Sequence, residues 1–282
     1  MKSAGGSRRW IPFCVVWSAA GLLSACQSVQ TTQPGVVGVE RKQTMTSLLP
    51  ASQVNGGAEK AYQQVLQDAR KKNQLNRDAA QLARVKQVAE RLIPATSAFR
   101  NDAQGWKWEV NVITSAEVNA WCMPGGKIAF YTGLIEKLQV SDGEMAAVMG
   151  HEIAHALREH GRERASAAVL QSTVLNIGAA LLGVSGSAVD LSSTILDVTF
   201  NLPNSRQDET EADRIGIELA ARAGFDPHAA VSLWQKMSQL GGGRGPAFLS
   251  THPSPDNRIK DLQVYAERVM PLYQAAQAAR KP

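Results

Sequence analysis

Cysteine is scarce in this sequence of 282 residues, which contains three. Cys14 and Cys26 lie in the first 26 residues, which have the features of an export signal, and Cys122 is the one cysteine beyond them. A secreted domain with a single cysteine has no internal disulfide. Such a domain is held together by its hydrophobic core alone, and an apolar content of 44% suits a packed core.

A concentration of positive charge is also missing. The formal net charge is +5, and Lys2, Arg8 and Arg9 in the leader supply three of these charges, which leaves +2 for the rest of the chain. No run of Lys and Arg is interleaved with aromatic residues, which make up 6% of the sequence. The electrostatic footprint of a nucleic-acid-binding protein is therefore absent, and we expect no nucleic-acid partner.

Long apolar runs are absent as well. The apolar stretch at residues 11–23 is too short to cross a bilayer comfortably. Residues 165–183 are apolar too, but polar residues such as Gln171 and Asn176 interrupt them. We expect a buried helix or a lid over the site here, with a membrane-associated helix as the alternative.

The first 26 residues combine a positive head, an apolar run and small residues, as an export signal does. The run ends at residues 23–26 in Leu-Ser-Ala-Cys, which resembles the lipobox of bacterial lipoproteins. The resemblance implies that Cys26 is lipidated and becomes the first residue; the alternative is an ordinary signal peptide with a chance cysteine. By resemblance to lipoprotein sorting in Gram-negative bacteria, Gln27 in place of an Asp implies a periplasmic protein anchored in the outer membrane.

Beyond the leader we predict one domain with flanking segments. Residues 27–57 are rich in Gln, Thr, Val, Gly and Ser without a sustained period, which is typical of a flexible tether. Residues 58–270 form the predicted domain, and residues 271–282 form a C-terminal tail. No internal repeat is visible.

Helical spacing of apolar residues dominates the predicted domain. It predicts two helices within residues 58–93. Residues 108–113 alternate with period two, and residues 127–131 follow a Pro-Gly-Gly turn at 124–126, which predicts a small antiparallel sheet. Further helices have start signals at Ser141, Ser205, Asp226 and Ser254. The expected fold class is α+β and mostly helical, a single domain with a small sheet beside the helix that carries the site.

The most specific motif is His-Glu-Ile-Ala-His at residues 151–155, inside the helix that begins at Ser141. Residues four apart share a helical face, so the imidazoles of His151 and His155 can reach one metal ion. Glu152 lies about 100° around the helix from His151, where it can flank the metal without binding it, as a general base for water requires. The alternative is a chance association of two helical histidines with a glutamate.

A catalytic zinc ion needs a third protein ligand and an open position. In residues 205–213, Glu209 and Asp213 are four apart on one helical face. Glu209 can bind the metal there, while Asp213 accepts a hydrogen bond from the far nitrogen of a ligand histidine. Glu211 lies about 200° from Glu209 and is excluded as a ligand. The alternative is an acidic, solvated first turn favoured by the helix dipole.

Several separated motifs together resemble a known family. Besides residues 151–155, they are Ser-Arg-x-x-Glu-x-x-Ala-Asp at 205–213, Thr-His-Pro at 251–253, Arg-Ile at 258–259, Asn-Ala at 119–120 and the turn at 124–126. The combination resembles the gluzincin zinc metallopeptidases that include bacterial HtpX, mitochondrial Oma-type proteases and CAAX prenyl-protein proteases. The resemblance covers most of residues 58–270. The sequence lacks the clear membrane spans of HtpX and the prenyl proteases, and is closer to the periplasmic lipoprotein branch.

The resemblance implies a set of site residues. One zinc ion is held by His151, His155 and Glu209, Glu152 is the base, and Asp213 supports a ligand from behind. A strand at residues 119–123 is expected to pair with an extended peptide by strand addition, in which main-chain hydrogen bonds hold the substrate. This strand comprises Asn119, Ala120, Trp121, Cys122 and Met123. Cys122 and Met123 would line the cleft, and the alternative for both is simple core filling.

Two residues near the end of the domain have several expected roles. His252 could donate to a developing oxyanion, close the zinc as a fourth ligand, or be a structural loop histidine. Arg258 could bridge to a carboxylate near the site or anchor its own helix. His160 and His228 are expected to be structural, at the surface or in the core.

These features predict a zinc metalloendopeptidase that hydrolyses peptide bonds in misfolded or envelope proteins in the periplasm. Its expected partners are unfolded or extended polypeptides, the membrane through an N-terminal lipid, and the outer-membrane protein assembly machinery. One alternative is a chaperone or assembly factor for outer-membrane proteins that binds clients and rarely cuts them. Another is a structural lipoprotein with incidental zinc. An intact Glu152 argues against the chaperone, because a pure binder does not need it, and the structural lipoprotein would trap no clients at all.

Overall fold

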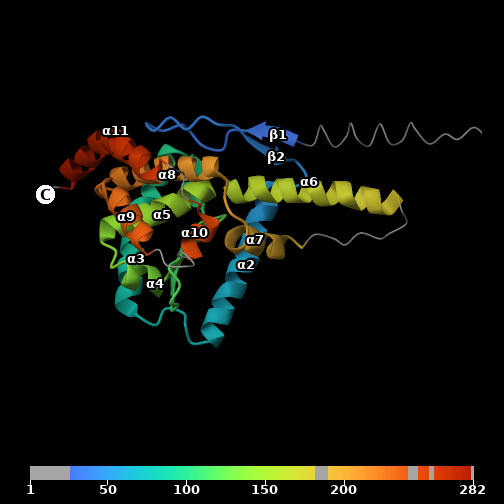
Figure 1. The fold of residues 1–282 in the computed structure, drawn as a ribbon, viewed down its shortest axis with the longest axis horizontal. Helices are drawn as coiled ribbons and strands as arrows, with labels where there is room; N and C mark the ends of the chain where they lie inside the picture. Colours follow the sequence, from blue (N-terminus) through green and yellow to red (C-terminus); the bar gives the residue numbers. More distant parts are fainter. Residues whose placement is uncertain (1–25, 182–189, 241–246, 254–256, 281–282) are drawn as a thin grey trace, which may run out of the picture.

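The described chain is largely helical. A computed structural model describes residues 26–181, 190–240, 247–253 and 257–280, with the backbone alone for 172–181. Residues 1–25 of the expected signal and residues 182–183 of the apolar stretch lie outside the described residues, whereas Cys26 is described and exposed. The helices are α2 (Ala51–Lys71), α3 (Ala79–Leu92), α4 (Thr132–Lys137), α5 (Asp142–Leu157), α6 (His160–Leu181), α7 (Leu191–Phe200), α8 (Arg206–Arg222), α9 (Ala229–Gln239), α10 (Ala247–Thr251) and α11 (Arg258–Ala279), with short 3₁₀ helices η1 (Ile93–Ala98) and η2 (Asn101–Gly105) (Figure 1).

Two small sheets complete the architecture, and the expected α+β, mostly helical class is confirmed. One sheet pairs the strands β1 and β2, and the other has the order β3–β5–β4. Their bounds are β1 (Cys26–Val29), β2 (Gln43–Thr46), β3 (Glu109–Ile113), β4 (Ala120–Met123) and β5 (Lys127–Tyr131).

The three-stranded sheet mixes parallel and antiparallel pairing. The expected turn at residues 124–126 joins β4 to β5 as an antiparallel hairpin, and Gly125 and Gly126 supply its positive φ angles of 81° and 83°. β3 pairs with β5 in parallel. The expected antiparallel pairing of residues 108–113 with 127–131 is therefore wrong. The chain after β3 first crosses the width of the sheet to β4, which leaves the central place to β5.

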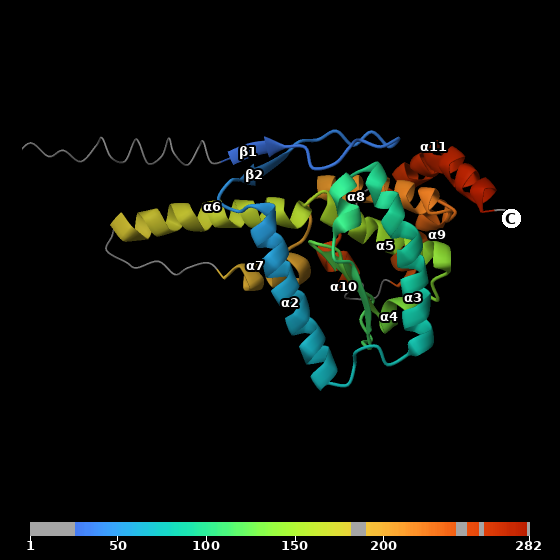
Figure 2. The ribbon, with the colours of Figure 1, turned by 180° about the vertical axis from the view of Figure 1, so that it is seen from behind.

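Residues 26–46, here called the N-terminal segment, pack on the domain. Figures 1 and 2 show the segment running over α8 and beside the start of α6. Val37, Val39 and Met45 are buried, and the Val37 N–H donates to the Glu218 carboxylate at 3.0 Å. A flexible tether over residues 27–57 is therefore wrong for this segment. The segment is mostly polar, but a few apolar side chains reach the core. Their irregular spacing gives no helical or strand period from which this packing could be predicted.

The central helix α5 is buried on every side. All its residues from Glu144 to Leu157 are buried, and it packs against α3, α8, α9 and the strand β4. A helix that is covered all round lies inside a protein rather than at its surface. The motif at residues 151–155 is therefore placed in the interior of the domain, and its polar side chains need partners there.

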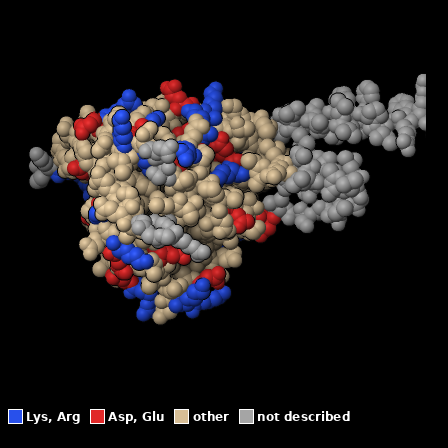
Figure 3. All heavy atoms as spheres, viewed as in Figure 1, with Lys and Arg blue, Asp and Glu red and all other residues tan. Residues whose placement is uncertain are grey.

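The interrupted apolar stretch forms much of α6, which projects from the body in both ribbon views (Figures 1 and 2). Near its start, Ala165 and Ser166 are buried. Within the described residues, no helix combines the length and the apolar content that crossing a membrane requires. On the described part of the face in Figure 3, basic and acidic side chains are interspersed.

A pair of glycines sets the distance between α5 and α8. A Cβ atom at Gly150 would lie 2.7 Å from the Gly216 carbonyl oxygen, and one at Gly216 would lie 2.7 Å from the His151 backbone nitrogen. Only residues without side chains allow this approach. Because the second contact is with His151 itself, the glycine pair also determines how near α8 comes to the motif helix.

Replacing Gly216 by Ala is expected to push α8 away from α5. We expect a loss of roughly 1–3 kcal/mol of unfolding free energy from overpacking, together with weaker zinc binding. Thermal unfolding and zinc titration measure the two effects. Gly56→Ala is the matched control, because a Cβ atom at that helical position meets nothing within 4 Å; it should not destabilise the protein. If Gly216→Ala were as stable as the unchanged protein, the contact between Gly150 and Gly216 would not determine the distance between α5 and α8.

Candidate metal centre

Both helices that carry the motifs begin with a capping box. In α5 the Ser141 hydroxyl accepts from the Glu144 N–H, and in α8 the Ser205 hydroxyl accepts from the Asp208 N–H. Each acidic side chain in turn accepts from the backbone N–H of its serine. These caps fix where each helix starts. Glu209 consequently lies in the first turn of α8, where the helix dipole favours a negative charge.

The structure brings three expected ligand residues together. The Nε2 atoms of His151 and His155 are 3.1 Å apart, and they lie 3.5 Å and 3.3 Å from the two carboxylate oxygens of Glu209. His252 joins them, with its Nδ1 3.2 Å from His151 Nε2 and 2.9 Å from Glu209 Oε1. All four side chains are buried.

The cluster has the dimensions of a zinc site. Ligand atoms about 2.0–2.1 Å from a tetrahedral zinc ion lie roughly 3.3 Å from one another, and the observed separations are 2.9–3.5 Å. The far nitrogens of both motif rings, Nδ1 of His151 and of His155, have their own hydrogen-bond partners, so the Nε2 atoms are left to face Glu209. Among the described residues, the buried Glu209 Oε2 forms no hydrogen bond, and its nearest cationic atom is Arg258 Nη1, 3.1 Å away in an ion pair. The residues present therefore fit a zinc ion.

The electrostatics of the cluster favour positive charge between the rings. Burial by itself lowers the pKa of His151, but the carboxylates of Glu209 and Asp213 raise it to about 9. Burial opposes ionisation of Glu209, yet the charges of His252 and His151 hold its pKa well below the usual value. In His155 the effect of burial prevails and lowers the pKa well below the usual value. In the metal-free cluster the carboxylates therefore stabilise a proton on His151, and a zinc ion would take its place, because zinc binds the neutral imidazole and the ionised carboxylate.

Asp213 lies where the spacing predicts. Its Oδ1 accepts from His151 Nδ1 at 2.9 Å and from Arg258 Nη2 at 2.7 Å. Arg258 also places Nη1 3.1 Å from Glu209 Oε2, and its guanidinium stacks 3.3 Å above the Trp234 ring. Arg258 is therefore a bridge between two acidic residues of α8, which is the first of its two expected roles.

Glu152 faces a pocket beside the cluster. The pocket lies between β4 and the helices α5, α6 and α7, and Glu152, His155 and His252 line it together with Asn119 and Cys122. Burial raises the pKa of Glu152. Its Oε1 is 3.5 Å from His252 Nε2 and has no hydrogen-bond partner among the described residues. A carboxylate with a raised pKa and a free oxygen beside a metal centre is suited to accept a proton.

The residues of the expected substrate strand divide between pocket and core. Asn119, Ala120, Trp121 and Cys122 line the pocket. Met123 is 1% exposed and packs with Tyr62 and Trp121 in a buried hydrophobic cluster, so the core-filling alternative applies to it. Burial and the nearby Glu152 raise the pKa of the Cys122 thiol well above its usual value. A protonated thiol is not a nucleophile, and Cys122 serves as part of the pocket wall.

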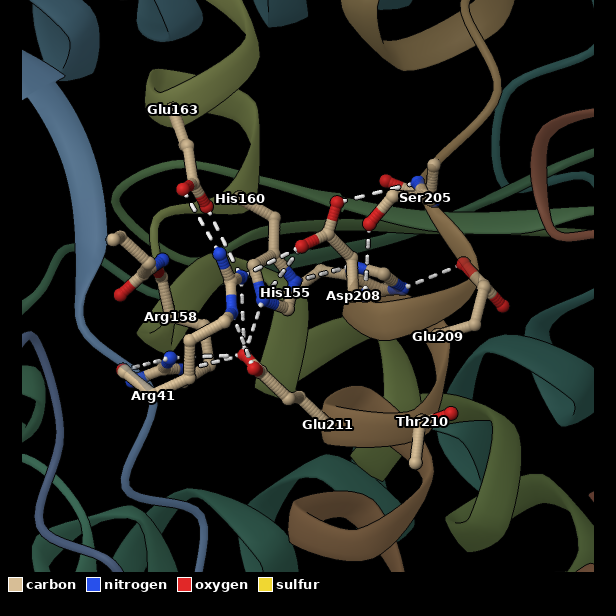
Figure 4. A network of polar contacts seen from close by, with 12 residues as sticks. Arg41, His155, Arg158, His160, Glu163, Ser205, Asp208, Glu209, Thr210 and Glu211 are labelled. Carbon is tan, nitrogen blue, oxygen red and sulfur yellow. Dashed lines mark hydrogen bonds and ion pairs between the residues drawn. The ribbon is translucent and has the colours of Figure 1, made fainter.

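The structure adds His160 to the surroundings of the metal centre, whereas the sequence predicted a structural histidine at the surface or in the core. His160 is fully buried, and its Nδ1 lies 2.8 Å from Nδ1 of His155 (Figure 4). On a continuous helix, a residue five places after His155 would point elsewhere. Here α5 ends at Leu157 and Glu159 takes a left-handed φ of 53°, so α6 starts in a new direction and returns His160 to the site. His228, by contrast, is exposed between Asp226 and Glu267, which agrees with a structural role.

Comparison with known proteins gives a consistent set of matches. The model of peptidase family M48 matches residues 79–266. The mitochondrial metalloendopeptidase OMA1 of Schizosaccharomyces pombe is 40% identical over 159 residues, which are 56% of this chain and 46% of that protein. The metalloprotease YcaL of Escherichia coli is 26% identical over 259 residues, which are 87% of this chain and 93% of that protein.

A third relative has a name that points to a process. The beta-barrel assembly-enhancing protease of Escherichia coli is 28% identical over 170 residues, which are 57% of this chain and 35% of that protein. The chain thus spans less than half the length of this relative and of the OMA1 protein above.

Proposed function

The chain belongs to peptidase family M48, and from this premise we propose that it is a zinc-dependent endopeptidase of the bacterial periplasm that cleaves misfolded or envelope proteins. One observation carries the proposal: His151, His155 and Glu209 converge in the interior, with Glu152 beside them at a pocket bordered by β4. Metal ligands and a proton acceptor at the same pocket are what metal-assisted hydrolysis requires.

The residues of the pocket define the steps of hydrolysis. Zinc, when bound, supplies a Lewis acid that polarises a carbonyl group and acidifies water. Glu152 accepts a proton from the attacking water and passes it to the leaving amine. Asp213 and Arg258 hold His151 and Glu209 in position, so the ligands need no rearrangement during the reaction.

β4 is the proposed binding edge for the substrate. It is the outer strand of the β3–β5–β4 sheet, and within the described residues its outer edge pairs with no other strand. An extended peptide could add to this edge through main-chain hydrogen bonds, with its scissile bond beside Glu152. Because such bonds do not depend on side chains, this arrangement suits unfolded segments with varied sequences.

His252 has the geometry of a fourth ligand in the proposed site, where it would occupy the position that the attacking water needs and hold the resting enzyme latent. It is 6% exposed, and its Nδ1 lies within hydrogen-bond distance of His151 Nε2, of Glu209 Oε1 and of Asn204 Nδ2. This burial argues against a loop histidine without contacts at the site. An oxyanion donor would have to use the other ring nitrogen, Nε2, which points toward Glu152.

An assay of casein cleavage tests the endopeptidase proposal against the chaperone alternative. The protein without residues 1–26, loaded with zinc, should bind one zinc ion per chain and cut unfolded casein. A chaperone would suppress the aggregation of an unfolded client and leave its length unchanged. Zinc-loaded protein that protects casein without producing fragments would therefore favour the alternative.

The proposed location depends on lipidation of Cys26. The cysteine is exposed at the start of β1, which leaves its sulfur accessible. The name of the beta-barrel assembly-enhancing protease suggests the assembly of β-barrel proteins as the setting. Cys26→Ser is expected to abolish labelling by a radioactive fatty acid and to move the protein from the membrane to the soluble periplasmic fraction. An unchanged membrane fraction would exclude lipid anchoring at this residue.

A further inference from the structure

The Nδ1 atoms of the two motif histidines, which face away from the metal cluster, have different hydrogen-bond partners. His151 Nδ1 donates directly to the carboxylate of Asp213 at 2.9 Å. His155 Nδ1 instead meets Nδ1 of a second imidazole, His160, at 2.8 Å, and His160 Nε2 lies 3.2 Å from Glu211 Oε2. The carboxylate that supports His155 is therefore one residue farther away than the one that supports His151.

The two hydrogen bonds that link His155 to His160 and His160 to Glu211 both donate toward Glu211. Because His155 Nε2 faces the cluster, its ring proton is on Nδ1, which donates to His160 Nδ1. The ring proton of His160 is then on Nε2, where it donates to Glu211. The series of hydrogen bonds thus ends on the carboxylate of Glu211, which is also paired with Arg41 and Arg158.

Arg41 and Arg158 hold this carboxylate from the other side (Figure 4). Arg158 is fully buried, with Nη2 2.9 Å from Glu211 Oε2. Arg41 contacts three acidic side chains: Nε lies 2.5 Å from Glu211 Oε1, Nη2 2.8 Å from Asp208 Oδ1, and Nη1 2.9 Å from Glu163 Oε1. The two guanidinium groups keep Glu211 in one orientation.

His160, Asp208 and Glu211 are close enough together to hold a metal ion of their own. We do not assign one to them, because Arg41 and Arg158 already neutralise the two carboxylates. The cations that these carboxylates bind are guanidinium groups of the chain itself.

Arg41 belongs to the N-terminal segment, residues 26–46, and the segment is fixed to the domain on the way to it. The Gln33 N–H donates to the Phe99 carbonyl at 2.7 Å, and the Val37 N–H donates to Glu218 at 3.0 Å. These contacts reach a helical turn and α8 from a part of the chain more than a hundred residues before His155. The segment therefore contributes a side chain to the surroundings of the cluster.

We propose that His160 is a positioning residue for the zinc ligand His155, and that Arg41 makes the N-terminal segment part of the metal centre by fixing Glu211 behind His160. This inference rests on the proposed zinc site. His160 sets which nitrogen of His155 carries the proton and how its ring is turned. Glu211 orients His160, and Arg41 and Arg158 orient Glu211.

Zinc affinity tests the proposal independently of activity. It is measured by competition with a chromogenic chelator on the chain without residues 1–26, beside the unfolding temperature of the metal-free protein. His160→Leu is expected to weaken zinc binding by roughly 10–100-fold, the usual effect of losing a partner of a metal ligand. His160→Gln, whose amide can accept from His155 and donate to Glu211, should restore most of the affinity. Activity of the variants should fall in kcat more than in KM.

Arg41→Gln extends the test to a position whose side chain is 22% exposed, so that folding is less at risk. It should weaken zinc binding by roughly threefold to tenfold, less than loss of a direct partner. Arg84→Gln is the matched control: like Arg41, Arg84 pairs with a carboxylate, that of Asp142, and it also donates to the Val140 carbonyl, but Asp142 begins α5 whereas His155 lies near the end of this helix. It should bind zinc as the unchanged protein does.

The outcomes separate this proposal from the proposed function. If the unchanged protein binds no zinc, the proposed function fails. If it binds zinc and His160→Leu binds equally well, positioning by His160 is refuted. If His160→Leu is impaired while Arg41→Gln matches Arg84→Gln, the N-terminal segment is not part of the metal centre. Weaker binding in both variants with rescue by His160→Gln supports the proposal in full.

Discussion

Glu152→Gln is expected to bind one zinc ion per chain and to cleave casein more slowly than the unchanged enzyme by roughly 10²–10⁴-fold. The amide has the shape of the carboxylate but cannot accept the proton of the attacking water. Zinc should be retained because Glu152 faces the pocket beside the ligands: its Oε1 has His252 as its nearest ion-pair partner at 3.5 Å. Metal content and initial cleavage rates, measured on the same preparation, give both numbers.

This variant also separates the enzyme from the chaperone alternative in cells. A strain carrying Glu152→Gln should behave like a deletion strain if the protein acts by cutting its clients. It should behave like the parent strain if client binding alone matters. Casein cleavage by Glu152→Gln within tenfold of the parent rate would show that the proton acceptor is a different group.

Glu209→Gln is expected to lose zinc, activity and much of the stability that zinc confers. A ligand carboxylate is replaced by a neutral amide in a fully buried position, and Arg258 Nη1 loses the charge 3.1 Å away. Zinc at about a thousand times its dissociation constant stabilises the folded state by roughly 4 kcal/mol, which corresponds to an unfolding temperature higher by on the order of 10 °C. Calorimetry with and without a chelator measures this difference.

Chelation of the unchanged protein should lower its unfolding temperature by that amount, and Glu209→Gln should no longer respond to the chelator. Glu218→Gln is the matched control, since Glu218 is also fully buried on α8 but pairs with Arg222 and the Val37 N–H. It should lose some stability and still respond to the chelator. A Glu209→Gln protein that binds zinc as tightly as its parent would remove this residue from the ligand set.

The residues of the centre could be read from the sequence because helical geometry is local and regular. His151 and His155 share a face of α5, and Glu209 and Asp213 share a face of α8, as their spacing of four requires. The capping serines Ser141 and Ser205 fixed the helix starts in advance. Only the meeting of the two faces was non-local, and it depends on the Gly150–Gly216 contact, which no spacing rule reveals.

Three features could not be predicted from the sequence, because each depends on the path that the chain takes between elements. Whether β3 pairs in parallel with β5 depends on the route between them, and the route has no periodic signal. His160 came back to His155 because the chain turns at Glu159, a residue type that rarely takes a positive φ. Arg41 lies in a polar segment whose few buried side chains lack helical or strand spacing, so its contact with Glu211 could not be foreseen.

The account depends most on a single zinc ion shared by α5 and α8. Anomalous diffraction at the zinc edge, from crystals of the zinc-loaded protein, locates such an ion directly. We predict one strong peak per chain, within bonding distance of His151 Nε2, His155 Nε2 and a carboxylate oxygen of Glu209. A peak that lies away from Glu209, or a zinc-loaded crystal with no peak between these three side chains, would contradict the account.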